Sequence, residues 1–407
     1  MKILLVNHFP LEGSGSGTYT KNLSQHLAKR GNEVHVVFPE NIIPQEVPGV
    51  VLHPVYFTDQ EGVKPVPYAL PFNFPCFTTH PRSLVTFGDL SEAELAQYLD
   101  TFRSAIAEVV EAIHPDIIHA QHVWLLGDVA CQTGLPCVLT AHGTDMMGYR
   151  LWSHLRPYAD DAVERCAHII AISRDNLEDT TETIPAAAPK MVLMLNGYNE
   201  DVFYLQQTDR DEVLARYGIE LAPEDEIVLF AGKLTNFKGV DTLLRAAAVY
   251  EQEHPEIVTL IAGDGEEREN LDALATELDL KRTYFLGHQS QDDLRELYNM
   301  SNLFAMPSRR EPFGLVALEA LGCGLPVVAT NQGGLPEFVT GDRGELVDVD
   351  DADGLVKAII HQLDVNQTMP DRHERLSADV RDSFAQSKFA ARLEQFYQQT
   401  IDEVEAV

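Results

Sequence analysis

The sequence predicts an α/β protein with two domains, each containing a doubly wound parallel β-sheet with helices on both faces. Short runs rich in valine, isoleucine and leucine alternate with longer amphipathic stretches along the whole chain, which is the pattern of consecutive βαβ units. The length of 407 residues exceeds that of one ordinary domain. With 45% hydrophobic and 23% charged residues, the composition is that of a globular protein.

The first predicted domain covers residues 1–200. Its strands are short and apolar enough to be buried on both faces: Lys2–Val6, Glu33–Phe38, Ile117–His119, Cys137–Ala141, His168–Ile172 and Met191–Leu195. A helix is expected over Tyr19–Arg30, with Thr18 as its N-cap and Gly31 after its end. A capping box formed by Ser91 and Glu94 starts a second helix.

Residues 41–90 interrupt this alternation with many prolines and with the aromatic residues Phe72, Phe74 and Phe77. We expect a long irregular insertion here. Long loops in compact domains often carry function. The sequence leaves open whether this segment lines a binding site or is a structural excursion.

The second predicted domain covers residues 201–384. A polar and acidic stretch from Asn196 to about Glu226 is interpreted as the connection between the domains, and a second series of strands and helices begins after it. Its strands are expected at Ile227–Ala231, Val258–Ala262, Tyr284–Leu286, Leu303–Met306 and Val327–Ala329. Helices are expected after Gly239, Glu266, Gln291, Gly314 and Asp351. Residues 371–407 are also expected to be helical, and a helix over about 385–407 is expected to pack back on the first domain, although periodicity alone does not fix this.

The charge of the chain argues against nucleic-acid partners. There are 63 acidic and 30 basic residues, a formal net charge of −33, whereas nucleic-acid binding depends on clustered lysine and arginine. No apolar run reaches the roughly 18 residues that a membrane-spanning helix needs, and the apolar run at the start is too short for a signal peptide. Five cysteines, without CxxC spacing, fit a reducing cytoplasm best. A heavily solvated acidic surface accounts for the charge.

The first strand is followed by the glycine-rich segment Gly13–Thr18. Glycines allow a phosphate to approach the backbone, and a helix N-terminus supplies free N–H groups. Both an anion site and a flexible turn remain open. The segment lacks the G-x-G-x-x-G dinucleotide fingerprint, which disfavours a nicotinamide-dependent dehydrogenase.

Two segments of the second half carry charged side chains at strand ends. Lys233 and Lys238 follow a predicted strand, at the sheet edge where open α/β sheets bind ligands, and could neutralise a diphosphate. Glu311 precedes a predicted helix and Glu319 lies on it; the separation corresponds to about 12 Å along a helix axis. One carboxylate could bind sugar hydroxyls and the other a ribose, with the amides of residues 313–315 facing phosphates between them.

The run Ser308–Glu319 resembles the E-x7-E signature of retaining glycosyltransferases with the GT-B fold, a family that includes sucrose-phosphate synthases and bacterial mannosyltransferases. The glycine-containing segments 322–330 and 333–337, the loop 233–239 and His142–Asp145 are similar to the same family. The family more often has arginine where this chain has Lys233, and residues 41–90 lack recognisable motifs, as its variable acceptor region does. The resemblance implies two Rossmann-like domains facing across a cleft.

The resemblance also implies roles for residues around the donor. Glu319 would bind the ribose and Glu311 the hydroxyls of the transferred sugar, while Lys233 and Lys238 would hold the diphosphate. Gly17 would approach the diphosphate from the other domain. The remaining donor contacts would be base recognition near His288 and phosphate binding at Phe313, Gly314 and Leu315.

On the reaction side, the resemblance implies that His142 contacts the donor sugar and polarises the reaction centre. Taken without the family, a lone histidine at a strand end is more often structural, and the resemblance reverses that preference. Tyr149, Arg150 and Arg156 follow His142 and could meet an anionic acceptor or form surface ion pairs. A small molecule, a saccharide or a lipid-linked molecule could be the acceptor.

The expected activity is metal-independent transfer of a hexosyl unit from a UDP-sugar, in preference to a GDP- or ADP-sugar, to give an α-glycoside. The alternatives are a nucleotide-sugar epimerase or hydrolase of related fold, which would consume donor without acceptor, and a non-catalytic nucleotide-sugar-binding module. No cofactor or metal is expected. Asp348 and Asp350 look like a metal-binding DxD but are expected to be a solvated helix cap, and the spacing of Asp116, His119 and His122 does not suit a metal site.

Overall fold

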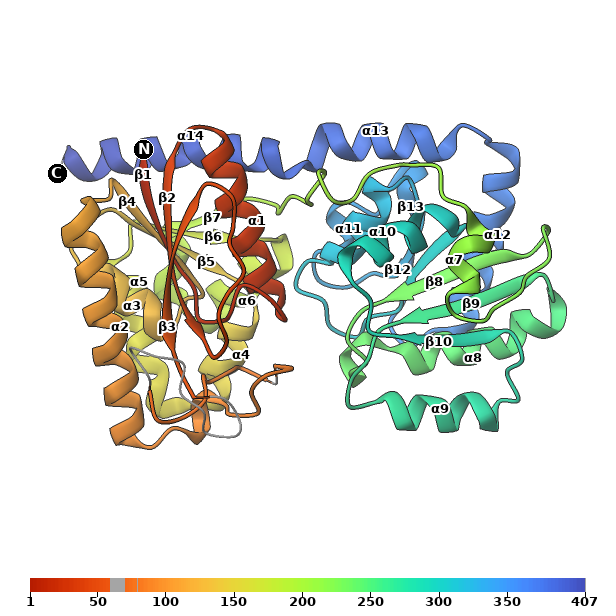
Figure 1. Cartoon of the computed structure of the whole chain (residues 1–407), viewed down its shortest axis with the longest axis horizontal. Coiled ribbons are helices and arrows are strands. Elements are labelled where there is room, and N and C mark those ends of the chain that lie inside the picture. Colours follow the sequence, from red (N-terminus) through yellow and green to blue (C-terminus); the bar gives the residue numbers. More distant parts are fainter. Residues whose placement is uncertain (59–69, 79, 407) are drawn as a thin grey trace. The chain divides into compact units, whose positions relative to one another are not determined.

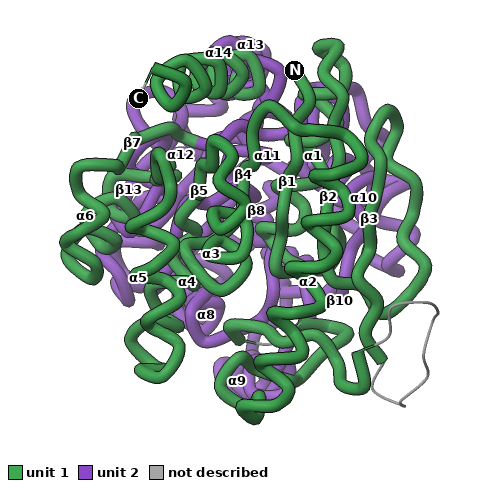
Figure 2. The backbone as a smooth tube through the Cα atoms, turned by 90° about the vertical axis from the view of Figure 1, so that its left-hand side faces the viewer, with its two compact units in different colours: residues 1–195, 389–407 green, residues 196–388 purple. Residues whose placement is uncertain are grey.

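The computed structural model describes residues 1–58, 70–78 and 80–406 of the chain. It divides into two compact units: unit 1 contains Met1–Leu195 and Phe389–Val407, and unit 2 contains Asn196–Lys388 (Figures 1 and 2). Each unit has its own parallel sheet and its own apolar core. Both are Rossmann-like, which confirms the predicted fold class.

Unit 1 contains a seven-stranded parallel sheet in the order β3-β2-β1-β4-β5-β6-β7. Its strands are β1 (Lys2–Val6), β2 (Glu33–Glu40), β3 (Val50–Tyr56), β4 (Ile117–Gln121), β5 (Cys137–Ala141), β6 (His168–Ala171) and β7 (Met191–Leu193). The helices are α1 (Gly15–Lys29), α2 (Glu92–Ile113), α3 (Leu125–Cys131), α4 (Thr144–Leu151), α5 (Arg156–Arg165) and α6 (Arg174–Thr183). Strand and helix alternate along most of this unit, as the sequence predicts, but β3 follows β2 directly and α5 follows α4 with no strand between them.

Both faces of the unit 1 sheet are covered. Leu4 and Val6 of β1 pack in one apolar cluster with residues of α2, α3 and α5. Ile3 and Leu5 point to the opposite face, in a cluster with residues of α1 and of the final helix α14 (Gln386–Glu405). Alternate residues of one strand therefore serve two cores, which is why these strands are apolar throughout.

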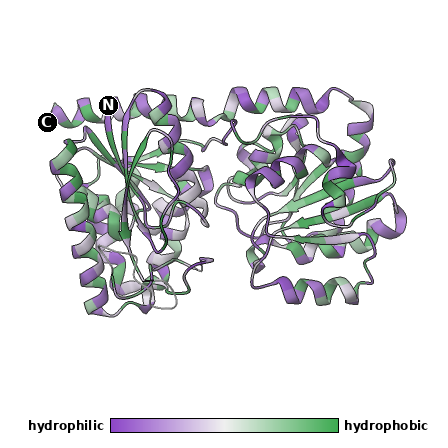
Figure 3. Ribbon diagram, in the orientation of Figure 1, coloured by the Kyte–Doolittle hydropathy of each residue, from purple (hydrophilic) through white to green (hydrophobic). Residues whose placement is uncertain are grey.

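Unit 2 contains a six-stranded parallel sheet in the order β10-β9-β8-β11-β12-β13. Its strands are β8 (Glu226–Ala231), β9 (Ile257–Ala262), β10 (Thr283–Gly287), β11 (Leu303–Met306), β12 (Val327–Thr330) and β13 (Gly344–Val347). The helices are α7 (Arg210–Ala215), α8 (Val240–Glu253), α9 (Arg268–Glu277), α10 (Gln291–Met300), α11 (Leu315–Gly322), α12 (Ala352–Thr368) and α13 (Arg372–Phe384). In Figure 3 the strands are mostly hydrophobic, while the helices carry most of the hydrophilic residues.

The expected insertion over residues 41–90 needs correction. It contains the regular strand β3, which pairs in parallel with β2, and it contributes Phe74 and Phe77 to the buried core of unit 1. The expectation of an irregular segment failed because β3 is an edge strand, where a proline such as Pro54 is tolerated. Residues 59–69 of the insertion, with Pro65 and Pro67, lie outside the described residues.

The first helix also begins earlier than predicted. α1 starts at Gly15, and its N-cap is Ser14, whose Oγ accepts a hydrogen bond from the Gly17 N–H at 3.1 Å. Thr18 therefore lies inside the helix and does not cap it. Two glycines in the first turn concealed this start, because glycine has a low helix propensity.

The acidic stretch 196–226 contains α7 and belongs to unit 2. Near the start of the stretch, Tyr198 pairs with the end of α13. The N–H of Tyr198 donates to the Phe384 carbonyl at 3.0 Å, and the N–H of Gln386 donates to the Tyr198 carbonyl at 2.8 Å. The Glu200 carboxylate accepts a further hydrogen bond from the Gln386 N–H at 2.8 Å. The segments that leave unit 2 at its two ends are thus joined to each other.

Candidate functional site

The lysine loop of unit 2 lies at the carboxyl end of β8. Lys238 ends a short 3-10 turn over Asn236–Lys238, and its Nζ lies 2.5 Å from Glu311 Oε2. The pair is poorly accessible, with side-chain exposures of 24% for Lys238 and 9% for Glu311. β8 and β11 are neighbours in the sheet, so the loops after them meet at one edge. The structure therefore brings two predicted site residues together.

Glycines explain how this loop lies so close to the sheet. Gly239 has a φ of +63°, and a Cβ there would come 2.0 Å from the Pro307 carbonyl oxygen. Gly333 has a φ of +57°, and a Cβ there would come 1.6 Å from the carbonyl oxygen of Glu311. A side chain at either position would displace the backbone that carries the ion pair.

Arg309 connects the lysine loop to the glutamate loop, and sequence reasoning missed it. Its guanidinium donates to the Asn236 carbonyl at 2.9 Å and to both carboxylate oxygens of Asp241 at 2.8 Å. It also donates to Asp350 at 2.7 Å. Asp350 therefore forms an ion pair, and the N-cap of α12 is Asp351, whose carboxylate accepts the Gly354 N–H at 2.8 Å.

Glu319 lies on α11, whose N-cap is Gly314 with a φ of +100°. Burial raises the pKa of the Glu319 carboxyl to about 8, so the free protein holds it mostly protonated at neutral pH. Burial and the nearby Glu319 charge raise the pKa of the Tyr298 hydroxyl, which is buried without a hydrogen-bond partner among the described residues. The carboxyl thus lies in a poorly solvated pocket of side chains.

The residues between the two glutamates form the start of α11. Phe313 is buried with its ring 5.3 Å from that of Phe338, and a Cβ on Gly314 would come 2.6 Å from the Leu335 side chain. Leu315 is the first residue of the helix. This packing holds the helix N-terminus, whose first N–H groups have no partner within the helix.

Lys233 and His288 are more exposed. Lys233 follows β8, and its Nζ lies 3.7 Å from Glu266 Oε2, with side-chain exposures of 41% and 58%. His288 is exposed directly after β10. Both follow strands at the carboxyl edge of the sheet, as predicted, and their roles in donor binding stay predictions.

In unit 1, His142 directly follows β5 and is buried. Its Nε2 lies 2.9 Å from Gln121 Oε1, and its ring centroid lies 4.7 Å from that of His122. Burial lowers the pKa of His142 to about 3. The imidazole is therefore neutral at physiological pH and can act as a hydrogen-bonding group but not as a cation.

Asp145, three residues after His142, fixes the backbone of this turn. Its buried carboxyl accepts hydrogen bonds from the N–H groups of Val123 at 3.0 Å, Met146 at 3.2 Å and His142 at 3.3 Å. Burial raises the pKa of Asp145 to about 6, and the hydrogen bonds from these amides oppose that rise. The sequence contained Asp145, but only the structure shows that it ties the ends of β4 and β5 together.

Gly17 lies in the first turn of α1. A Cβ at this position would come 2.0 Å from the Pro10 carbonyl oxygen. Contact between the helix and the preceding loop therefore accounts for the glycine. A donor contact by Gly17 stays a prediction.

The three residues predicted as possible acceptor contacts, Tyr149, Arg150 and Arg156, all make contacts within unit 1. The Tyr149 hydroxyl donates to Asp160 at 2.9 Å. Arg150 pairs with Asp179 and donates to Thr183, and the guanidinium of Arg156 stacks 5.2 Å from the centre of the Tyr149 ring. An acceptor role for Tyr149 or Arg150 requires that these contacts open, and it stays a prediction.

Among the described residues, no group of three or more histidine, cysteine, aspartate or glutamate side chains is arranged to hold a metal ion. His119 instead contacts Tyr397 Oη at 2.5 Å and Thr140 Oγ1 at 2.6 Å. Within the same described part of the chain, every helix is too short or too polar to cross a membrane.

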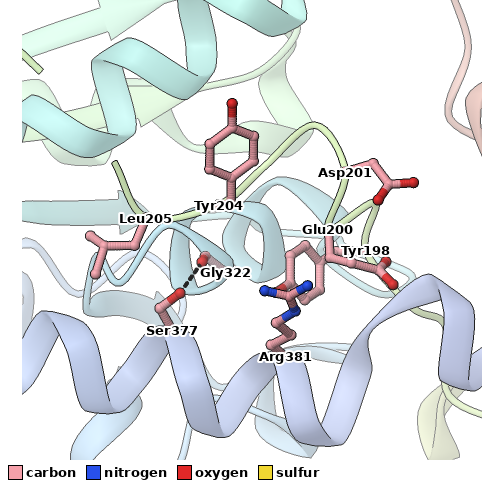
Figure 4. Close-up of a pocket in the computed structure, with 8 residues that line it drawn as sticks. All are labelled: Tyr198, Glu200, Asp201, Tyr204, Leu205, Gly322, Ser377 and Arg381. Atoms are coloured by element: carbon pink, nitrogen blue, oxygen red, sulfur yellow. Dashed lines mark hydrogen bonds between the residues drawn. The ribbon is translucent and has the colours of Figure 1, made fainter. Parts of the chain in front are cut away.

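A cavity of about 370 Å³ lies in unit 2 (Figure 4), and none of its lining residues belongs to the lysine loop. Arg381 extends from α13 among the other lining residues in Figure 4. The lining residues are Tyr198, Glu200, Asp201, Tyr204, Leu205, Gly322, Ser377 and Arg381. None of these is a predicted donor or acceptor contact.

Two family models match the chain. The model described as glycosyl transferases group 1 matches residues 210–380, and the model described as glycosyltransferase family 4 matches residues 13–202. The first covers the lysine loop and both glutamates, and the second covers His122 and His142.

Curated relatives and solved structures agree with these models. A D-inositol 3-phosphate glycosyltransferase of Mycobacterium sp. (strain JLS) is 30% identical over 376 residues, 85% of this chain and 78% of the relative. The N-acetyl-alpha-D-glucosaminyl L-malate synthase of Bacillus anthracis is 26% identical over 94% of this chain and 93% of the relative.

Among solved structures, the sucrose-phosphate synthase from Thermosynechococcus elongatus has a TM-score of 0.75 at 22% identity, with 99% of this chain and 100% of that chain covered. Anabaena HepE in complex with UDP and glucose has a TM-score of 0.72 at 20% identity, with 98% and 99% covered. The fold and these matches define a glycosyltransferase with the GT-B fold. More narrowly, the chain belongs to the group 1 glycosyltransferases whose N-terminal part is of family 4.

Proposed function

We propose that the chain transfers a hexosyl unit from a UDP-sugar to an acceptor hydroxyl with retention of configuration, giving an α-glycoside. The observation that carries this proposal is the ion pair of Lys238 and Glu311. Glu311 precedes α11 in the chain, and α11 carries Glu319. The pair supplies a cation for a diphosphate and a carboxylate for hydroxyl groups at the carboxyl edge of the unit 2 sheet, and this supports a donor site there.

In the donor complex, Glu319 accepts hydrogen bonds from the ribose and Glu311 accepts them from the transferred sugar. Lys238, with Lys233, neutralises the diphosphate, and the amides near Phe313 and Leu315 donate to its oxygens. His288 borders the base. A UDP-sugar is the favoured donor, supported by Anabaena HepE, which was solved in complex with UDP and glucose.

The chemical step needs positioning and charge stabilisation. As the bond between the sugar and the diphosphate breaks, negative charge grows on the leaving oxygen, and Lys238 stabilises it. The acceptor oxygen bonds to the anomeric carbon on the same face, and the departing diphosphate takes the acceptor's proton. Neutral His142 contacts the donor sugar during this step. The lysines supply positive charge, so we propose that no metal is required.

The acceptor is proposed to be a small hydroxylated molecule. The names of two relatives specify D-inositol 3-phosphate and L-malate, both anionic. These compounds belong in the first acceptor panel, beside neutral saccharides and lipid-linked sugars.

The test incubates the full chain with UDP-, GDP- and ADP-sugars, with and without acceptors, and measures nucleotide diphosphate release. Acceptor-dependent UDP release and an α-linkage by NMR are expected, unchanged by EDTA. Release without any acceptor would indicate a hydrolase, and a changed sugar with no release an epimerase. A β-linked product would overturn retention, and activity lost in EDTA and restored by Mg²⁺ or Mn²⁺ would overturn metal independence.

A further inference from the structure

Gln121 is the last residue of β4 and joins two histidines at the carboxyl edge of the unit 1 sheet. Its backbone carbonyl oxygen lies 2.9 Å from His8 Nδ1, and its side-chain Oε1 lies 2.9 Å from His142 Nε2. β4 lies between β1 and β5 in the sheet, so the residues after these strands flank Gln121. All three side chains are buried.

The hydrogen-bond partners assign the protons on His8. The Leu126 N–H donates to His8 Nε2 at 3.0 Å, so Nε2 carries no proton. The proton of this neutral ring therefore lies on Nδ1, which donates to the Gln121 carbonyl. Burial lowers the pKa of His8 to about 3, in agreement with a neutral ring. The His8 Nδ1–H group thus donates a hydrogen bond to the Gln121 carbonyl oxygen and fixes the backbone of Gln121.

The same reasoning applies to His142. An amide oxygen only accepts hydrogen bonds, so Oε1 of Gln121 requires a proton on His142 Nε2. Because the ring is neutral, its Nδ1 then carries a lone pair. We propose that Gln121 is a positioning residue that fixes this tautomer, so that His142 Nδ1 accepts a hydrogen bond from a substrate hydroxyl. The hydroxyl belongs to the sugar or to the acceptor, and its assignment rests on the proposed function.

Within the described parts of the chain, the hydrogen bond to Gln121 is the one that the structure gives to His142 Nε2. The rings of His122 and Tyr19 lie 4.7 Å and 5.3 Å from it, centroid to centroid. The Asp145 carboxylate is held by backbone N–H groups, including that of His142 itself at 3.3 Å. The Gln121 amide is therefore the side-chain group that the structure places on this nitrogen.

The first test is independent of activity. In full-length protein labelled with ¹⁵N-histidine, the ring nitrogens of His142 are identified by their loss in His142→Asn, and protonated and unprotonated nitrogens are then distinguished by their shifts. A proton on Nε2 is expected in the wild type. A proton on Nδ1 would mean that the amide is turned the other way and would overturn the proposal, even if glycosyl transfer itself is established.

The second test compares two substitutions of Gln121. Gln121→Leu removes the acceptor and should lower kcat by about tenfold or more with a smaller change in KM, as expected when an imidazole loses its tautomer control. Gln121→Glu keeps an acceptor on Nε2, so it should restore much of the rate at high pH. The charge of the carboxylate introduced by Gln121→Glu would raise the pKa of His142. As the pH is lowered, the rate of Gln121→Glu should therefore begin to fall at a higher pH than the rate of the wild type.

A double substitution separates positioning from a general structural role. In a His142→Ala background, adding Gln121→Leu should lower kcat little further, because the residue on which Gln121 acts is gone. Exposed Gln97→Leu on α2 serves as the surface control. Equal losses from Gln121→Leu in both backgrounds would overturn the proposal. If Gln121→Leu does not fold, the ¹⁵N spectrum of the wild type and the pH profile of Gln121→Glu still decide the question.

Discussion

Glu319 combines burial with a proposed need for negative charge. Its pKa of about 8 means that the free protein holds a neutral carboxyl, while ribose hydroxyls donate more strongly to a carboxylate. Nucleotide binding should therefore release a proton. We expect the affinity for UDP, measured by calorimetry, to rise from about pH 7 to about pH 9 in the wild type, and to stay flat in Glu319→Gln. Equal pH slopes for the two proteins would contradict the ribose role.

The same pKa predicts a pH-dependent stability. The folded-state pKa is raised from an ordinary value of 4.5, so this carboxyl contributes stability below about pH 4.5 that is lost as the pH rises through about 8. Glu319→Gln should therefore become more stable than the wild type above about pH 8, by about 1 kcal/mol or more. Urea unfolding at several pH values measures this difference, and a constant difference across the range would refute it.

Lys238 is the residue on which the proposed chemistry most depends. Lys238→Ala should lower turnover by about 10²-fold or more, because it removes the cation that stabilises the leaving diphosphate. It also leaves Glu311 poorly solvated without its partner. Lys281→Ala removes an exposed lysine paired with Asp279 and should leave turnover unchanged. Wild-type turnover in Lys238→Ala would remove its assigned role.

At the scale of elements, the lysine loop contains only the short 3-10 turn Asn236–Lys238, so contacts with other segments must stabilise its shape. Arg309 supplies that support through Asn236, Asp241 and Asp350. Arg309→Ala should lower turnover about tenfold and destabilise unit 2 by about 1 to 3 kcal/mol, because it leaves charged and polar groups unpaired. Arg375→Ala, which removes a more exposed ion pair with Asp371, is the matched control. Unchanged kinetics in Arg309→Ala would show that the turn holds its shape unaided.

The elements show what sequence patterns can and cannot predict. The buried central strands were predicted because apolar runs mark strands covered on both faces. β13 was missed because this short edge strand starts at Gly344 and carries Glu345, and α3 was missed because all of its residues are buried, which removes the polar face of a surface helix.

In the site, as in the fold, some features were predicted from the sequence and others were not. The resemblance implied that Lys238 and Glu311 belong to one donor site, but their direct ion pair was not predicted and is seen only in the structure. The supporting residues Arg309 and Gln121 act through side-chain bonds to segments far along the chain. Periodicity carries no information on such bonds, so only coordinates reveal them.

At the scale of the whole molecule, unit 1 depends on the end of the chain. Leu393 of α14 is buried in one cluster with Ile3, Leu5 and Leu23. Leu393→Ala should destabilise unit 1 by about 2 to 5 kcal/mol, whereas Gln395→Ala on the exposed side of α14 should change stability by less than about 0.5 kcal/mol. The chain's two tryptophans, Trp124 and Trp152, both lie in unit 1, so their fluorescence follows its unfolding. Similar midpoints of unit 1 unfolding for Leu393→Ala and Gln395→Ala would contradict the dependence of unit 1 on α14.

This arrangement sets an order of events on the ribosome. The strands of unit 1 emerge before unit 2, but one face of their sheet, already packed against α1, lacks the part of its cover that α14 supplies until residues 389–401 have been translated. Unit 2 is continuous in sequence and can complete its own core while that face is still open. The part of the enzyme made first is therefore finished last, and during synthesis its uncovered apolar face is the surface that a nascent-chain chaperone would meet.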